Sequence, residues 1–118
     1  MHRFKELEIW KRSKIFCSVI YTETNNFPSS EQFGLTNQIR RSAVSIPSNI
    51  AEGASRTSQK EFSRFLEIAL GSAYEMETQI LIAEDLKFLP QEKTAYILDE
   101  LNQIVKMISK FRSQLKTN

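Results

Sequence analysis

The amino-acid sequence predicts an all-α fold, an antiparallel up-down-up-down bundle of four helices. Apolar residues recur at steps of three and four over long segments, and no segment alternates apolar and polar residues as a strand does. Glycine and proline number only three each among 118 residues, which leaves room for few connections and favours long helices. The length fits one domain, residues 1–118. The alternative is a pair of helical hairpins that folds only as an intertwined oligomer.

The first expected helix spans residues 4–24. Its expected inner side consists of Phe4, Leu7, Trp10, Cys17, Ile20 and Tyr21. Cys17 is expected to act as a small core residue. The segment 25–28 interrupts the helix, because asparagine favours turns and Pro28 biases the preceding residue away from the helical region. Ser29 and Gln32 have the spacing of a capping box that would begin the second helix.

The second helix contains the segment 35–56. Its apolar stripe consists of Leu35, Ile39, Ala43, Ile46 and Ile50. Pro47 stands inside this stripe, and a kink is expected because proline has no N–H for the Ala43 carbonyl and its ring crowds that oxygen. The short polar side chains around the kink could hydrogen-bond the freed carbonyl; they are Ser42, Ser45, Ser48 and Asn49. Gly53 is expected to end the helix.

The third helix is expected to be the longest, with Ser58 and Glu61 as a capping box at its start. Its seam is Phe62, Leu66, Ala69, Ala73, Met76, Ile80 and Ala83. Gly71 near the middle suggests close approach of a neighbouring helix. Two further apolar stripes include Leu70, Tyr74 and Leu81, as well as Ile68 and Ile82. One core cannot easily cover all three stripes, so we expect subunits of a homo-oligomer to pack on Leu70, Tyr74 and Leu81.

The fourth helix is expected to have Pro90 as its first residue. Its apolar positions are Ile97, Leu101, Ile104, Ile108, Phe111 and Leu115. Again the steps are three and four, which is typical of bundle packing. Basic residues gather toward its C-terminal end, where they complement the helix dipole. The expected bundle is therefore complete with four helices.

Composition limits the classes of function. The formal net charge is only +2, but both ends of the chain are basic and residues 57–90 are acidic, with three basic and six acidic groups. The single cysteine allows no disulfide within the chain, and the charged N-terminal segment and the lack of a long apolar run predict a cytoplasmic protein without membrane contact. His2 is the only histidine and is expected in a frayed terminus. We therefore expect no catalytic residue, no metal site, no cofactor and no enzymatic activity.

One segment is specific enough to identify a family. The run QIRRSAVSIPSNIAEGASR, preceded by FPSSEQFGL and followed by EFSRFLEIALGSAYEMETQI, resembles the four-helix bundle proteins encoded in intervening sequences of bacterial 23S ribosomal RNA genes. The residues that carry the family motif are Arg41, Ser45, Pro47, Asn49, Glu52 and Gly53. The resemblance implies a ring-like homo-oligomer, a pentamer, of antiparallel bundles with no established activity. The family is similar to the accessory variability protein of diversity-generating retroelements, a more basic pentamer thought to bind nucleic acid and a reverse transcriptase.

Together, the resemblance and the basic ends predict a non-enzymatic oligomer that binds structured RNA or DNA, or a nucleoprotein partner. The candidate nucleic-acid-binding residues are Lys11, Arg12, Lys14, Arg41, Arg56, Lys106, Lys110, Arg112 and Lys116. Such residues would bind the phosphate backbone without base specificity. Three alternatives stay open: Arg41 and Arg56 could pair with Glu52 or Glu75, the lysines could form a solvated face, and the ring could be a protein-binding scaffold without nucleic-acid contact. No exposed aromatic residue for base stacking is expected.

Overall fold

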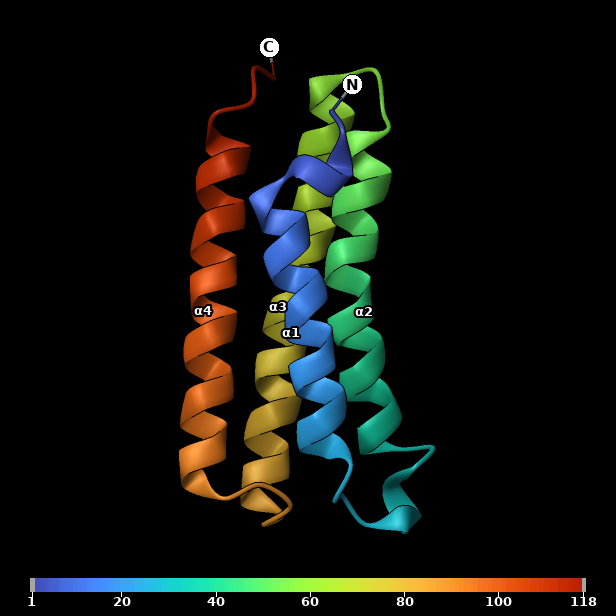
Figure 1. The fold of residues 1–118 in the computed structure, drawn as a ribbon, viewed down its shortest axis with the longest axis vertical. Coiled ribbons are helices and arrows are strands. Elements are labelled where there is room, and N and C mark those ends of the chain that lie inside the picture. Colours follow the sequence, from blue (N-terminus) through green and yellow to red (C-terminus); the bar gives the residue numbers. More distant parts are fainter. Residues whose placement is uncertain (1, 118) are drawn as a thin grey trace.

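The computed structural model describes residues 2–117, and four long helices run along its length of 46 Å (Figure 1). The α-helices are α1 (Glu8–Thr24), α2 (Leu35–Ala54), α3 (Gln59–Asp85) and α4 (Gln91–Ser113). Two short 3-10 helices, η1 (Phe4–Glu6) and η2 (Ser29–Glu31), precede α1 and α2. Within the described residues no strand is present, so the prediction of an all-α fold with four helices is confirmed.

Each helix packs on two others, in the cyclic order α1, α2, α3, α4 and back to α1. Contacts at the helix ends show which helix termini lie next to each other. The backbone N–H of His2 donates to the Ala54 carbonyl at the end of α2, and Lys93 at the start of α4 pairs with Glu23 at the end of α1 at 3.1 Å. The colours of Figure 1 show that the chain runs along one helix to the far end of the molecule and returns along the next.

The expected seam of α3 is confirmed. All seven of its residues are buried, as are the first four apolar positions of α4, while Phe111 and Leu115 pack partly buried against them. At the start of α3 the Ser58 hydroxyl accepts a hydrogen bond from the Glu61 N–H, which is one of the two bonds of the expected capping box. Pro90 lies one residue before the expected place, as the cap of α4.

The expected inner side of α1 is wrong in part. Its buried residues are Ile9, Ser13, Phe16, Ile20 and Thr24, and Tyr21 is exposed. The two hydroxyls can lie in the core because Ser13 donates to the Ile9 carbonyl and Thr24 to the Ile20 carbonyl, each at 2.8 Å. Residues 4–24 also do not form one helix, because η1 ends at Glu6 and α1 begins at Glu8. His2 is half-buried against Phe62, with ring centroids 5.1 Å apart, rather than frayed.

The start of α2 also differs from the prediction. Ser29 and Gln32 belong to a turn in which the Gln32 N–H donates to the Ser29 carbonyl, so they form no capping box. The helix begins only at Leu35, whose N–H donates to the Glu31 carboxylate at 3.1 Å. A carboxylate is favoured there because the first turn of a helix leaves N–H groups without partners and carries a partial positive charge.

Pro47 lies inside an uninterrupted α2, and a partner in another helix replaces its missing donor. The Cys17 thiol of α1 donates to the Ala43 carbonyl, with 3.2 Å between sulfur and oxygen. None of the serines expected for this role contacts that oxygen among the hydrogen bonds of the described residues, and Asn49 donates instead to the Ser45 carbonyl. Cys17 is therefore both a half-buried packing residue and the donor that proline removes from α2.

The glycines have roles opposite to those expected. Gly53 is buried inside α2 rather than ending it, and a Cβ there would stand 2.7 Å from Cβ of Phe65 and 2.8 Å from Cδ1 of Phe62. It therefore permits the close approach of α2 and α3. Gly71 is exposed and a Cβ there would meet nothing within 4 Å, so no neighbouring helix of the same subunit requires a glycine at that position.

Candidate functional site

Three of the nine basic residues singled out in the sequence are held within the bundle by partners on other elements or turns. Arg12 of α1 hydrogen-bonds Glu100 at 3.3 Å and Gln103, both of α4. Arg112 of α4 donates to the Ser63 carbonyl at 3.1 Å and to the Glu67 carboxylate at 2.9 Å. Arg56 pairs with Glu52 at 3.0 Å and lies over the Phe65 ring at 4.9 Å. These guanidinium groups join helices or helix ends.

The two lysines of α1 are three residues apart and therefore lie on the same side of that helix, but their contacts differ. Lys11 pairs with Glu8 at 3.4 Å, whereas Lys14 lies over the Trp10 ring at 5.5 Å. Arg12 of α1 lies against α4, where its guanidinium contacts Glu100 and the Met107 sulfur.

Five of the candidate residues keep exposed charges that no ion pair among residues 2–117 occupies. They are Lys14 on α1, Arg41 on α2, Lys106 and Lys110 on α4, and Lys116 beyond it. Lys106 and Lys110 are one turn apart and so lie on the same face of α4. The expected pairing of Arg41 with Glu52 or Glu75 is absent from the described ion pairs.

Ser45 of the family motif lies at the contact between α2 and α3. The Ser45 and Ser72 hydroxyls share a hydrogen bond of 2.8 Å, and the Asn49 amide donates to both the carbonyl and the hydroxyl of Ser45. One turn earlier, the buried Ser42 hydroxyl lies 3.2 Å from the Glu75 carboxylate. This polar contact holds α2 against α3 with small side chains.

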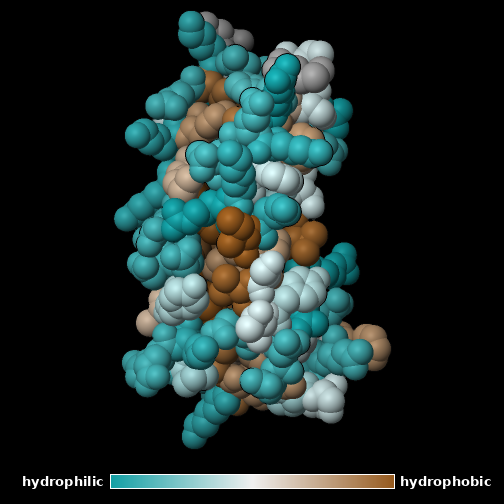
Figure 2. Space-filling view, in the orientation of Figure 1, coloured by the Kyte–Doolittle hydropathy of each residue, from teal (hydrophilic) through white to brown (hydrophobic). Residues whose placement is uncertain are grey.

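Several apolar side chains of the second and third stripes of α3 are exposed. Tyr74 is 57% exposed and Leu81 is 41% exposed, and Ile68, Ile82 and Leu86 are exposed to a similar extent. Leu70 is half-buried. Figure 2 shows another apolar patch midway along the face on which α1 lies in front. Elsewhere among the exposed apolar side chains, Ile15 of α1 is 67% exposed. Exposed apolar area of this kind is typical of a surface that another chain covers.

Sequence reasoning missed two exposed aromatic residues near Arg41. Phe33, between η2 and α2, is 88% exposed, and Tyr21 of α1 carries the Arg40 guanidinium 4.5 Å above its ring. The sequence contained one sign that Phe33 is exposed: it lies between Pro28 and Gly34 and belongs to no helical stripe, so no pattern predicted its burial.

Residues 2–117 hold no group of three or more histidine, cysteine, aspartate or glutamate side chains that could bind a metal ion. Nor is any helix in that range long and apolar enough to cross a membrane. Burial raises the pKa of the Cys17 thiol, which keeps it protonated and suits it to donate a hydrogen bond rather than to act as a nucleophile.

Comparison with known proteins agrees with the fold and identifies the family. No curated protein matches the sequence. The chain is similar in structure to a protein of unknown function from the S23 ribosomal protein family of Bacteroides thetaiotaomicron, with a TM-score of 0.82 and 24% sequence identity over 90% of this chain and 96% of that one. The family model of 23S rRNA-intervening sequence proteins matches residues 5–110. This chain therefore belongs to the 23S rRNA-intervening sequence protein family.

Proposed function

We propose that the protein is a non-enzymatic homo-oligomer that binds the backbone of structured RNA or DNA through the lysines of α4. The observation that carries this proposal is the pair Lys106 and Lys110, exposed on one face, with Lys116 following. Since Arg12 and Arg112 are engaged within the subunit, the charges of α4 that are available to phosphates are these lysines. The lysines bind the phosphate charges rather than the base edges, so binding does not depend on the nucleotide sequence.

The subunit of the proposed oligomer is an antiparallel up-down-up-down bundle with a kink at Pro47. The contacts of His2 with Ala54 and of Lys93 with Glu23 at the helix ends support that topology. The bond from the Cys17 thiol to the Ala43 carbonyl, which lacks its helical donor, supports the kink. The exposed apolar side chains of α3 support subunit contact through Leu70, Tyr74 and Leu81. The family resemblance implies that the subunits close into a pentameric ring. A ring repeats the α4 lysines around its axis, so several weak lysine–phosphate contacts act together.

Charge reversal tests nucleic-acid binding. We expect Lys106→Glu, Lys110→Glu and Lys116→Glu together to weaken binding of a labelled RNA stem-loop and of duplex DNA by at least tenfold in fluorescence anisotropy at about 50 mM salt. The matched control reverses Lys5, Lys60 and Lys87, three exposed lysines elsewhere, with the same change of net charge. Equal losses in both triple variants would mean that only net charge matters. Unchanged binding in the α4 variant would exclude this face.

Light scattering tests the subunit contact. Tyr74→Glu or Leu81→Glu places a charge in the proposed interface, so each variant is expected to form smaller species. Tyr96→Glu is the matched control, because Tyr96 is an equally exposed tyrosine on α4. An unchanged molar mass for the α3 variants, at a concentration where the wild type is oligomeric, would remove α3 from the interface.

A second candidate function is a protein-binding scaffold without nucleic-acid contact. The exposed apolar surface of α3 and Ile15 of α1 favour it, since such side chains bind protein rather than phosphate. The resemblance to the retroelement accessory protein suggests a nucleoprotein partner, which would use both kinds of surface. Partner binding that survives the triple charge reversal, combined with no RNA or DNA binding by the wild type, would favour the scaffold.

A further inference from the structure

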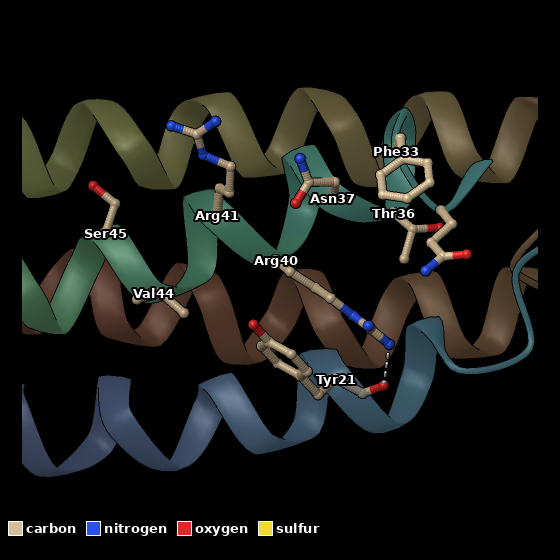
Figure 3. A pocket seen from close by; sticks show the side chains of 9 residues that line it. Tyr21, Phe33, Thr36, Asn37, Arg40, Arg41, Val44 and Ser45 are labelled. Atoms are coloured by element: carbon tan, nitrogen blue, oxygen red, sulfur yellow. Dashed lines mark hydrogen bonds between the residues drawn. The ribbon is translucent and has the colours of Figure 1, made fainter.

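A groove of about 550 Å³ lies over the first half of α2 and belongs to neither the α4 lysines nor the outer surface of α3. Figure 3 shows its arrangement: Arg40 extends from α2 toward Tyr21 of α1, Arg41 extends from the other side of α2, and Phe33 lies at the N-terminal end of that helix. Val44, about one turn further along α2, adds an exposed apolar side chain. Grooves of this size accommodate small ligands or one unit of a chain.

The groove offers flat apolar surfaces. Phe33 is 88% exposed and is absent from the aromatic pairs of the described residues. Arg40 covers one face of Tyr21 and is fixed there by hydrogen bonds from its guanidinium to the Thr24 hydroxyl at 2.9 Å and to the Asn25 amide oxygen at 3.3 Å. The Phe33 ring and the Arg40–Tyr21 stack are surfaces on which a planar ring can stack.

The same groove has two polar groups without partners. Thr36 is only 7% exposed, and its hydroxyl has no hydrogen-bond partner although it lines the groove beside Phe33 (Figure 3). Arg41 has no hydrogen bond or ion pair among the described residues, in contrast to Arg40. A buried hydroxyl without a partner is unusual, because folding normally satisfies such groups. A ligand with acceptor atoms and negative charge would satisfy both.

We propose that this groove binds a nucleotide unit whose base is unstacked, as in a single-stranded segment, loop or end of RNA or DNA. The base stacks on Phe33, its polar edge meets the Thr36 hydroxyl, and the phosphate pairs with Arg41. A nucleotide combines a planar ring and a negative charge in one unit, which is the combination that these residues match. This inference rests on the proposed function for the kind of ligand, but it assigns a different surface and a different form of nucleic acid.

Anisotropy with labelled eight-nucleotide single strands of uridine and of adenosine tests the groove, and a labelled duplex serves as the reference. Phe33→Ala and Arg41→Gln are expected to raise the Kd for single strands roughly fivefold to a hundredfold and to leave duplex binding unchanged. Tyr96→Ala and Arg64→Gln are the controls, because they remove an exposed aromatic residue of α4 and an exposed arginine of α3. Phe33 has little buried surface, so its truncation leaves the core intact. Ultraviolet cross-linking is expected to attach the strand at Phe33 or Tyr21.

The outcomes separate this inference from the proposed function. Duplex binding without single-strand binding, or single-strand binding that both variants retain, overturns the groove and leaves the α4 lysines as the site. Absence of all nucleic-acid binding overturns both. A lower molar mass of Phe33→Ala in light scattering also overturns the inference, because the groove would then be a contact between copies. Competition by free uridine or adenosine monophosphate at a Kd near that of the strand supports the site and identifies the free nucleotide as its source of ligand; its absence identifies the strand.

Discussion

The hydrogen bond from Cys17 to the Ala43 carbonyl predicts an energetic coupling between Cys17 and Pro47. The carbonyl belongs to a residue that is 1% exposed, and Pro47 deprives it of its helical donor. Cys17→Ala leaves that oxygen unsatisfied, at about 1–3 kcal/mol, and removes sulfur packing. Because the thiol is a weak donor and half-buried, we expect a total loss of about 2 kcal/mol in the free energy of unfolding.

The same substitution should be less damaging when residue 47 is not proline. In Pro47→Ala the new N–H donates to the Ala43 carbonyl, so Cys17→Ala then removes only packing. We expect a coupling of about 1 kcal/mol in a double-mutant cycle measured by urea unfolding at one protein concentration. Cys17→Ser keeps a donor and is the control, with a loss smaller than that of Cys17→Ala. Additivity within about 0.5 kcal/mol would refute the reasoning, since the two residues would then not share the carbonyl.

Three further predictions use the same unfolding assay. Gly53→Ala is expected to cost about 1–3 kcal/mol because its Cβ would stand 2.7 Å from that of Phe65, whereas Gly71→Ala, in open space, is expected to stabilise the subunit by about 0.5–1 kcal/mol; equal effects would contradict the assigned packing. Lys87→Gly is expected to stabilise by about 1 kcal/mol, because Lys87 has φ 64 after the end of α3; a loss would mean that its side chain matters more than its backbone. Because burial raises the pKa of Cys17, the thiol ionises at lower pH in the unfolded chain than in the folded one. The free energy of unfolding is therefore highest below the pKa of the unfolded thiol and falls as pH rises through the pKa of the folded thiol. Cys17→Ala should lack this decline.

The parts of the fold that follow from periodicity were predicted well. In α3 and α4 one apolar stripe is longer and more regular than any other, so it fixes which side faces the core. In α1 the stripe includes Ser13 and Thr24, and polar residues do not count as core positions in a search for apolar repeats. Their burial depends on hydrogen bonds to carbonyls four residues earlier, which hydrophobicity does not encode.

The start of α2 shows a different limit. The Ser29 and Gln32 spacing is common by chance, and the residue that serves the first turn is Glu31, through a bond to Leu35 N–H. A capping box of Ser29 with Gln32 and a contact of Glu31 with the Leu35 N–H are two possible helix starts that overlap in the sequence. The choice between them depends on the path of the whole segment after Pro28, which tertiary contacts determine.

The candidate site was the least predictable part. Charge alone does not reveal that Arg12 and Arg112 are held by α4 and α3 side chains, because that depends on how each helix is rotated about its axis. The same rotation exposes Tyr21, which the sequence placed inside. Lys106 and Lys110 are exposed because they lie away from the regular apolar stripe of α4.

The cyclic order of neighbours has a consequence for the speed of folding. Three of the four interfaces, α1 with α2, α2 with α3 and α3 with α4, join helices that follow one another in the sequence, and only the interface of α1 with α4 brings distant segments together. Contacts between consecutive helices require little loop closure and form rapidly, in microseconds to milliseconds for helical bundles. The late step is then the docking of α4 on α1, where Arg12 meets Glu100. Substitutions there should accelerate unfolding and leave the folding rate unchanged.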